Sequence, residues 1–212
     1  MTGFFVTGTD TDIGKTVVSA WLMQALDGDY WKPVQCGLVD GEGDSETVQR
    51  LTGFSDERFH APTHVFSAPR SPHEAAGKEG VTIALDDFIL PVTPRPLIVE
   101  GAGGVLVPLN DEMLMTDLMA RLSLPIILVA RTALGTINHS LLAIEALRAR
   151  GLDLAGIVLC GPEDAANRDA IQIHGRVPVI GALPRFARLD KSTLAAFTDQ
   201  SPPHFTDGSH HG

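Results

Sequence analysis

Residues 4–16 read FFVTGTDTDIGKT, and this one segment predicts how the chain is built. The apolar start, Phe4–Thr7, indicates a short buried strand that stops at Gly8. Residues 16–26 follow with apolar side chains at the spacing of a helix. The segment is therefore expected to turn from a strand into a helix, and such a turn directs backbone N–H groups toward an anion in front of the helix.

The rest of the chain continues this alternation of strands and helices. Further strands are expected at residues 30–34, 97–99, 125–130, 154–159 and 177–183, and helices at 45–51, 83–90 and 138–150. Residues 38–44 are expected to form a loop, and residues 62–72 to be mostly extended or looped. Continuous apolar strands alternating with helices indicate an α/β fold with a mostly parallel central sheet and helices on both faces. The loops after Thr7, Val34, Val99, Ala130 and Leu159 should then meet at the carboxyl edge, where such sheets bind ligands.

The size and charge of the chain limit the kinds of protein that it can be. Its 212 residues suit one domain, and 44% apolar with 20% charged residues is typical of a soluble globular protein. The formal net charge is −10, and an acidic surface repels phosphates. Nucleic acids and membranes are therefore not expected as partners. Any phosphate site must be a local positive pocket.

The termini and the cysteines favour the cytoplasm. The segment Met1-Thr2-Gly3 does not resemble a signal peptide, and no apolar run reaches the ~18 residues of a membrane span. Cys36 and Cys160 lie far apart without metal-ligand spacing and indicate reduced thiols. We expect a single domain over residues 1–197 and a flexible tail over 198–212, which is rich in Pro, Ser and His.

Residues 8–16 resemble the Walker A motif, with one departure. The common motif has a shorter interval between its glycines than the five residues that separate Gly8 from Gly14. The chemistry still holds, because Gly14 lets the backbone approach a phosphate closely and Lys15 can reach the β and γ phosphates. The hydroxyl of Thr16 can bind magnesium. A glycine-rich turn with a surface lysine is the alternative, which the strand before it and the helix after it disfavour.

Two aspartates lie inside this loop, where carboxylates would repel phosphate. Asp10 and Asp12 fit beside a phosphate only if a cation or an amine lies between. They suggest a second, positively charged ligand next to the loop. Two solvated loop aspartates are the alternative.

Three further charged residues are candidates for the same site. Glu100 follows the strand Leu97–Val99 and can hold magnesium directly or through water, as in Walker B segments. Asp44 can reach the same ion, although its acidic neighbours make that choice of residue weak. Lys32 lies in an expected buried strand, where a lysine is costly unless it meets an anion such as a γ-phosphate. An edge-strand lysine facing water is the alternative.

Residues 134–139 form another loop in front of an expected helix. The N-terminus of such a helix can bind an anion. An ordinary N-cap by Thr136 or Asn138 explains the same residues, so both interpretations stay open at this point.

Several motifs together make the chain resemble the dethiobiotin synthetases, which are ligases of biotin synthesis. These motifs are residues 5–16, 32–34, 71–73, 99–104 and 134–139, and the long interval in the phosphate loop is itself typical of the family. The resemblance implies a P-loop fold and an ATP- and magnesium-dependent cyclo-ligase. Its substrates would be 7,8-diaminononanoate and carbon dioxide or bicarbonate. A carbamate would be activated by the γ-phosphate of ATP, and ring closure would release dethiobiotin, ADP and phosphate.

The resemblance also implies roles for individual residues. Lys15 and Lys32 would stabilise the transferring phosphoryl group, with Thr11 also at the catalytic centre, and Thr16, Asp44 and Glu100 would hold magnesium. The nucleotide would contact Asp12, Ile13, Gly14, Lys15, Thr16, Val17, Glu100, Gly101, Ala102, Gly103, Cys160, Gly161, Pro184, Arg185 and Phe186. The diamine substrate would contact Thr11, Asp12, Lys32, Cys36, Ser71, Gly135, Thr136, Ile137 and Asn138. The last four would come from the partner subunit of a homodimer.

Two positions depart from the family pattern. Cys36 stands where the family often has Ser or Thr, and a thiol donates weakly, so the substrate contact there is expected to be looser. Cys160 stands where many members carry an asparagine that contacts adenine. Because a thiol lacks the paired donor and acceptor of an amide, we expect relaxed selectivity among nucleoside triphosphates.

Two other classes share this nucleotide core. One is an amide ligase or glutamine-dependent synthetase, such as a cobyrinate-type enzyme, which the short chain without a glutaminase domain disfavours. The other is a partition or switch ATPase, which would associate with DNA or membrane. Those ATPases usually carry a second lysine early in the loop, where this chain has Thr9, Asp10 and Thr11.

Overall fold

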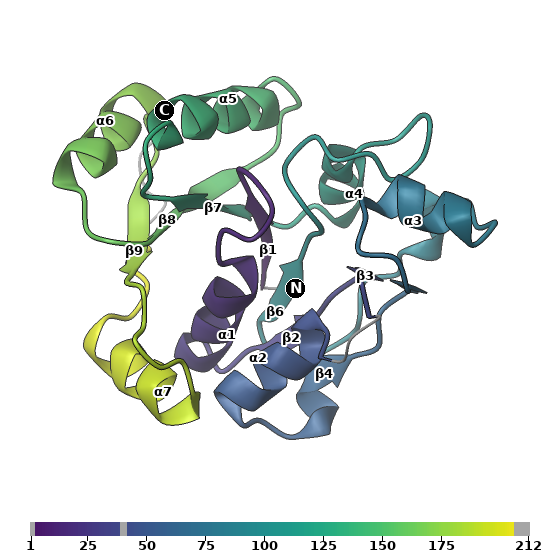
Figure 1. Ribbon diagram of the computed structural model, residues 1–212, viewed down its shortest axis with the longest axis horizontal. Coiled ribbons are helices and arrows are strands. Elements are labelled where there is room, and N and C mark those ends of the chain that lie inside the picture. Colours follow the sequence, from purple (N-terminus) through teal and green to yellow (C-terminus); the bar gives the residue numbers. More distant parts are fainter. Residues whose placement is uncertain (1–2, 39–41, 206–212) are drawn as a thin grey trace.

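The computed structural model describes residues 3–38 and 42–205. Its centre is a seven-stranded sheet with the order β4-β2-β6-β1-β7-β8-β9 (Figure 1). All neighbouring strands of this sheet pair in parallel, which confirms the expected α/β fold. The strands are Gly3–Gly8 (β1), Asp29–Trp31 (β2), Phe59–His60 (β4), Leu97–Glu100 (β6), Ile126–Arg131 (β7), Leu154–Cys160 (β8) and Val179–Leu183 (β9).

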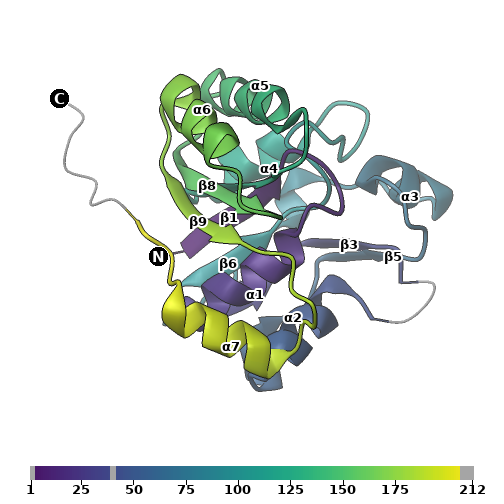
Figure 2. The same cartoon turned by 60° about the vertical axis from the view of Figure 1, so that its left-hand side comes forward.

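Helices cover both faces of the sheet, as Figure 2 shows. One face carries α1 (Lys15–Ala25), α2 (Asp44–Thr52) and α7 (Lys191–Gln200). The other carries α4 (Met115–Leu122), α5 (Thr136–Arg148) and α6 (Ala165–Gly175). Adjacent strand residues point to opposite faces, so Phe5 belongs to one buried core and Val6 to the other. Among the described residues, no helix is long and apolar enough to cross a membrane.

The expected strand at residues 30–34 is wrong, because it is two strands in two different sheets. The central sheet keeps β2, which ends at Trp31, while β3 (Val34–Cys36) pairs with β5 (His64–Phe66) in a separate two-stranded sheet. Pro33 separates the two strands. A proline has no N–H for the ladder, and the Pro33 carbonyl instead accepts from the backbone N–H of Thr63 and His64 at 3.0 Å.

The expected helix at residues 83–90 is also wrong, since only a short 3₁₀ turn, Leu85–Asp87, forms there. The Asp87 carboxylate accepts the Ala84 backbone N–H at 2.9 Å and lies 3.0 Å from the His64 ring. These contacts compete with the helical ladder. Residues 62–72, expected to be mostly extended or looped, contain the extended strand β5 and the start of α3 (Pro72–Lys78). Asp44 begins α2 instead of ending a loop. Residues 39–41 of that loop lie outside the described residues.

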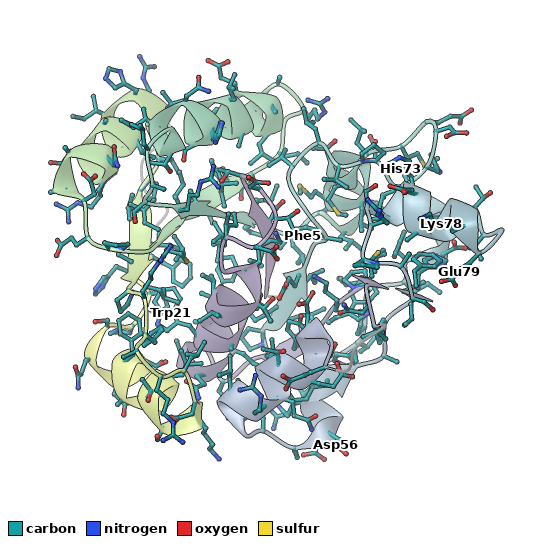
Figure 3. All side chains as sticks on the ribbon, in the orientation of Figure 1. Phe5, Trp21, Asp56, His73, Lys78 and Glu79 are labelled. Carbon is teal, nitrogen blue, oxygen red and sulfur yellow. The ribbon has the colours of Figure 1, made fainter. Side chains whose placement is uncertain are left out.

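Residues 198–205 pack more closely than a flexible tail would. Residues 198–200 complete α7, and the carbonyl of Ser201 accepts the Trp21 indole N–H at 3.0 Å. Figure 3 shows Trp21 between α1 and the C-terminal segment. Phe205 then stacks on Phe4, with ring centroids 4.8 Å apart. Residues 206–212 lie outside the described residues.

Candidate functional site

The phosphate loop runs from the end of β1 at Gly8 to the start of α1 at Lys15, in the middle of the sheet. Gly14 caps the helix with a φ of 104°, a conformation that side chains disfavour. A Cβ at this position would also lie 3.0 Å from the sulfur of Cys160. Lys15 is buried, and its ammonium donates to the backbone carbonyl of Asp10 at 2.8 Å. The loop therefore encircles a cation, as a phosphate site requires.

A second cation lies beside it in a network of buried charges. The Lys32 ammonium is 2.6 Å from Oδ2 of Asp44 and 3.0 Å from Oε1 of Glu100. It also donates to the Gly101 carbonyl at 3.0 Å. The Thr16 hydroxyl lies 3.1 Å from Oδ1 of Asp44 and 3.0 Å from Oε1 of Glu100. Three elements, α1, α2 and β6, and the connection between β2 and β3 thus bring the predicted lysine, threonine and carboxylates within hydrogen-bonding distance.

Strand register explains how Lys32 meets Glu100. Trp31 of β2 lies opposite Val99 of β6, so Lys32 and Glu100 are the next residues along two parallel neighbours. Both side chains point to the face that carries α1 and α2. The alternative of an edge-strand lysine in water is excluded, because only 3% of Lys32 is exposed.

The network alters the pKa values of its members. Burial and then the neighbouring Lys32 lower the pKa of Lys15. Burial alone would lower the pKa of Lys32, but Glu100 and Asp44 outweigh it and raise that pKa. Burial alone would raise the pKa of Asp44, but Lys32 outweighs it and lowers that pKa. Lys32 and Asp44 therefore carry opposite charges at neutral pH.

The same oxygen atoms suit a magnesium ion. The Thr16 hydroxyl lies within 3.1 Å of one carboxylate oxygen of Asp44 and of one carboxylate oxygen of Glu100. Magnesium prefers such oxygen ligands and usually takes few from the protein, because phosphates and water complete its shell. In the part of the chain that the structure describes, no cluster of three or more His, Cys, Asp or Glu suited to a metal occurs. The donor set therefore fits an ion that is held jointly with a phosphate.

We call the first of two cavities beside the loop the charged cavity. It has a volume of about 760 Å³ and is lined by both lysines, by Asp44 and by Glu100. The other expected residues that line it are Thr11, Asp12, Ile13, Gly14, Thr16, Val17, Cys36, Ser71, Ala102 and Gly103. The expected phosphate, metal and substrate residues of this chain therefore largely share one cavity.

We call the second cavity the β8–β9 cavity, because it lies at the ends of these two neighbouring strands. Its volume is about 860 Å³, and its lining includes Cys160, Gly161, Pro184, Arg185 and Phe186. All five were expected to contact the nucleotide. Asp12, Ile13, Gly14 and Val17 line both cavities, so the loop forms the boundary between them.

Five expected residues line neither cavity, and one of them, Gly101, accepts a hydrogen bond from Lys32. The others, Gly135, Thr136, Ile137 and Asn138, lie at the start of α5. Asn138 is exposed, and Thr136 is buried. This chain by itself does not bring these residues to the charged cavity.

Sequence reasoning missed one buried residue at the site. The Tyr30 hydroxyl donates to Oε2 of Glu100 at 3.0 Å. Burial and then Glu100 raise the pKa of Tyr30 well above its ordinary range, so the hydroxyl keeps its proton. The available signal was strand periodicity, because Tyr30 precedes Lys32 by two residues and so shares its face.

Comparisons with known proteins identify the family of this chain. A family model described as AAA domain matches residues 2–193. An ATP-dependent dethiobiotin synthetase BioD from Paramagnetospirillum magneticum is 50% identical over 206 residues, which cover 97% of this chain and 98% of that protein. A BioD from Nitrobacter hamburgensis is 52% identical over 199 residues, covering 93% of each chain.

A solved structure shows the same fold at low sequence identity. The ParA family ATPase from Chlorobium tepidum superposes with a TM-score of 0.55 and 13% identity, covering 95% of this chain and 90% of that one. At this identity the likeness concerns the fold alone. With half of its residues shared with synthetases over nearly their whole length, this chain belongs to the AAA-domain family and, within it, to the ATP-dependent dethiobiotin synthetases.

Proposed function

We propose that this protein closes the ureido ring of dethiobiotin from 7,8-diaminononanoate and carbon dioxide, with ATP converted to ADP and phosphate. The observation that carries the proposal is the convergence of Lys15, Lys32, Thr16, Asp44 and Glu100 on one cavity beside a helix N-terminus. Family membership supports the same activity. The reaction needs a phosphoryl transfer and two amine additions, and the cavity holds groups suited to each.

The two lysines suit the phosphoryl transfer. Charge develops on the transferring group, and fixed cations in a buried site stabilise it strongly. Lys15 and Lys32 both line the charged cavity, and both are held in place by backbone carbonyls. The carbamate oxygen needs only to be placed in line with the γ-phosphorus, so positioning replaces a strong general base.

Thr16, Asp44 and Glu100 would hold magnesium. When bound, the ion would neutralise charge on the β and γ phosphates. Thr16 is the second residue of α1, so its hydroxyl stands next to the helix N-terminus where a triphosphate binds. The two carboxylates come from the start of α2 and the end of β6.

The acidic residues in the charged cavity suit a diamine. Asp12, Glu42 and Glu74 line it together with Thr11 and Ser71. Carboxylates beside a phosphate loop are costly unless amines lie between, and a diamine supplies them. Cys36 also lines the cavity, and its thiol would make only a weak contact.

The β8–β9 cavity would take the nucleobase. Cys160 lines it and contacts the loop at Gly14, while Pro184, Arg185 and Phe186 form another wall. A thiol cannot supply both a donor and an acceptor to a base edge. We therefore infer relaxed selectivity among nucleoside triphosphates, which a comparison of turnover with ATP, CTP and GTP measures. A strong preference for ATP would contradict it.

A homodimer would complete the site. Residues 135–138 line neither cavity, and the first residues of α5 present a helix N-terminus that suits a carboxylate. A two-fold partner would bring this segment to the cavity of its neighbour. We place the enzyme in the cytoplasm, in keeping with the free thiols Cys36 and Cys160.

The direct test is incubation with diaminononanoate, bicarbonate, magnesium and ATP, followed by mass detection of the cyclic urea. Phosphate release should match urea formation in a one-to-one ratio. Omission of the diamine is the control for uncoupled hydrolysis. ATP hydrolysis without any urea would refute the ligase assignment, and so would urea that forms equally well without nucleotide.

A further inference from the structure

Tyr30 holds one oxygen of Glu100 from inside the protein. It is the only tyrosine in the sequence, and its side chain is fully buried. Tyr30 is absent from the lining of both cavities, while Glu100 lines the charged cavity. The hydroxyl therefore reaches the carboxylate from the side away from any ligand.

The two oxygens of Glu100 have different partners. Oε2 accepts only from Tyr30 among the described residues, at 3.0 Å. Oε1 faces Thr16 and Lys32, each at 3.0 Å. A hydrogen bond to a charged acceptor is stronger than a neutral one, and a buried oxygen without a donor is costly. The phenol thus favours the one orientation of the carboxylate that turns Oε1 toward the cavity.

Strand geometry makes this contact reproducible. Tyr30 of β2 lies opposite Ile98 of β6, two residues before Glu100 on the same face. The Tyr30 hydroxyl therefore reaches the carboxylate of a residue that lies two positions farther along β6 than its register partner. Packing against Phe59 of β4, with ring centroids 6.0 Å apart, holds the ring on its other side.

We propose that Tyr30 is a positioning residue, which orients Glu100 so that Oε1 is presented to Thr16, Lys32 and a nucleotide-bound magnesium ion. The inference rests on the proposed function only in taking magnesium and a nucleotide as the ligands. Tyr30 touches neither of them and acts through Glu100. Groups that orient a metal-binding carboxylate typically contribute about 10- to 100-fold to metal affinity or activity.

The first experiment separates metal binding from nucleotide binding. Calorimetry measures the affinity for ADP with EDTA and again with magnesium, in the unaltered protein and in Tyr30→Phe. In Tyr30→Phe, we expect the affinity for metal-free ADP to stay within about twofold of that of the unaltered protein. The gain from magnesium, which is the ratio of the ADP affinity with magnesium to that with EDTA, should fall about tenfold. An unchanged gain would overturn the proposal, as would an equal loss of both affinities.

Trp31→Phe is the matched control. Trp31 is the next residue of the same strand, is 2% exposed and donates to the Ala61 carbonyl at 3.1 Å, but it points to the opposite face. Its loss removes a buried donor from β2 without touching Glu100. The gain from magnesium should stay unchanged in this variant, and a loss equal to that of Tyr30→Phe would show a general effect of weakening the strand.

The second experiment needs no substitution at Tyr30. Because the chain has one tyrosine, growth on 3-fluorotyrosine gives a single ¹⁹F resonance that reports on its hydroxyl. We expect this resonance to move when magnesium is added to the ADP complex, and to lose the response in Glu100→Gln. A ¹⁹F chemical shift that does not change when magnesium binds would overturn the inference, even if Tyr30→Phe does not fold.

These outcomes are distinguishable from failure of the proposed function. Magnesium-dependent ADP binding with the expected ¹⁹F response, but without urea formation, would refute the ligase assignment and leave the role of Tyr30 intact. Normal urea formation by the unaltered protein, together with an unchanged gain from magnesium in Tyr30→Phe, would support the ligase assignment and refute the role of Tyr30. Failure of the unaltered protein to bind ADP at all would overturn both.

Discussion

The charged cavity and the β8–β9 cavity share one loop but are built in opposite ways. In the charged cavity, Lys32 and Glu100 are almost fully buried, and each polar atom has a specific partner. The β8–β9 cavity is lined by the partly buried thiol of Cys160, by Pro184 and by Phe186, and the side chain of Arg131 at its edge is 41% exposed. The two cavities meet at Asp12–Gly14.

The contrast indicates which positions should be most sensitive to substitution. Buried charges interact strongly, and an uncompensated one costs several kcal/mol, so few substitutions are tolerated among them. Exposed arginines and an apolar wall interact weakly with any one base, so they tolerate variation. The effects of substitution should therefore fall steeply from the charged cavity to the β8–β9 cavity.

The largest effect is expected from removing the loop cation. Lys15→Gln should lower turnover about 1000-fold or more, because it removes a charge that stabilises the transferring phosphoryl group. Phosphate release in single-turnover experiments measures it. The matched change across the boundary is Arg131→Gln, which should cost less than about tenfold because that side chain is largely solvated. Equal losses of turnover in Lys15→Gln and Arg131→Gln would contradict the expected difference in sensitivity between the two cavities.

Breaking the buried network should lower stability as well as metal binding. Glu100→Gln leaves the buried Lys32 with one carboxylate partner, and we expect the free energy of unfolding to fall by about 3 kcal/mol. Urea unfolding at pH 7 measures this loss. Glu163→Gln, an exposed carboxylate at the other cavity, should change stability by less than about 0.5 kcal/mol. The magnesium concentration needed for half-maximal turnover should rise only in Glu100→Gln, and an unchanged requirement would remove Glu100 from the metal site.

The two cysteines offer one reporter for each cavity. Burial raises the pKa of Cys36 to about 11 and that of Cys160 to about 12. Since the thiolate is the nucleophile, both should react with iodoacetamide at pH 8 about 100-fold or more slowly than a free thiol, with Cys160 the slower. Peptide mass spectrometry gives both rates. Nucleotide should protect Cys160 from the reagent, and diaminononanoate should protect Cys36. The reverse pattern would contradict the assignment of the nucleobase to the β8–β9 cavity and of the diamine to the charged cavity.

The same thiols predict the sign of a pH effect on stability. The unfolded chain releases its thiol protons near pH 9, while the folded chain keeps them to about pH 11 and 12. Their contribution to stability is therefore present below pH 9 and is lost as pH rises through that window. Stability that increases between pH 9 and 11 in the unaltered protein, but not in a Cys36→Ala Cys160→Ala variant, would contradict this sign.

The smallest effect concerns base selectivity. Cys160→Asn should raise the preference for ATP over CTP about tenfold, because an amide supplies a donor and an acceptor to one base edge. The ratio of kcat/KM values measures it. Cys160→Ala, which removes the thiol without adding an amide, should leave the ratio unchanged. A rise in the alanine variant would assign the effect to cavity size instead.

Local patterns predicted the central part of this protein well. The apolar run before Gly8, the helix after Gly14 and the alternation farther along the chain predicted the parallel sheet, which the structure confirms. Two charged residues were selected from the sequence, Lys32 inside one expected strand and Glu100 at the end of another, and they lie within hydrogen-bonding distance. Their roles in catalysis and metal binding stay predictions.

Prediction failed where distant contacts decide local structure. Lys32-Pro33-Val34 looked like one continuous strand, yet the chain changes sheets at Pro33 because β3 pairs with β5, which lies some thirty residues farther along. Residues 83–90 looked helical, but Asp87 makes contacts with Ala84 and His64 instead. Helices α3, α4, α6 and α7 were not predicted.

The phosphate loop, the parallel sheet and the family of this protein can be predicted from the amino-acid sequence, because each depends on short-range pattern and on glycine at particular positions. Which groups share a cavity depends on the folded structure. It divided one expected site into two cavities, left residues 135–138 outside both and placed Tyr30 behind Glu100. The physical reason is that strand register and helix packing join residues far apart in the chain, and no local pattern encodes those distances.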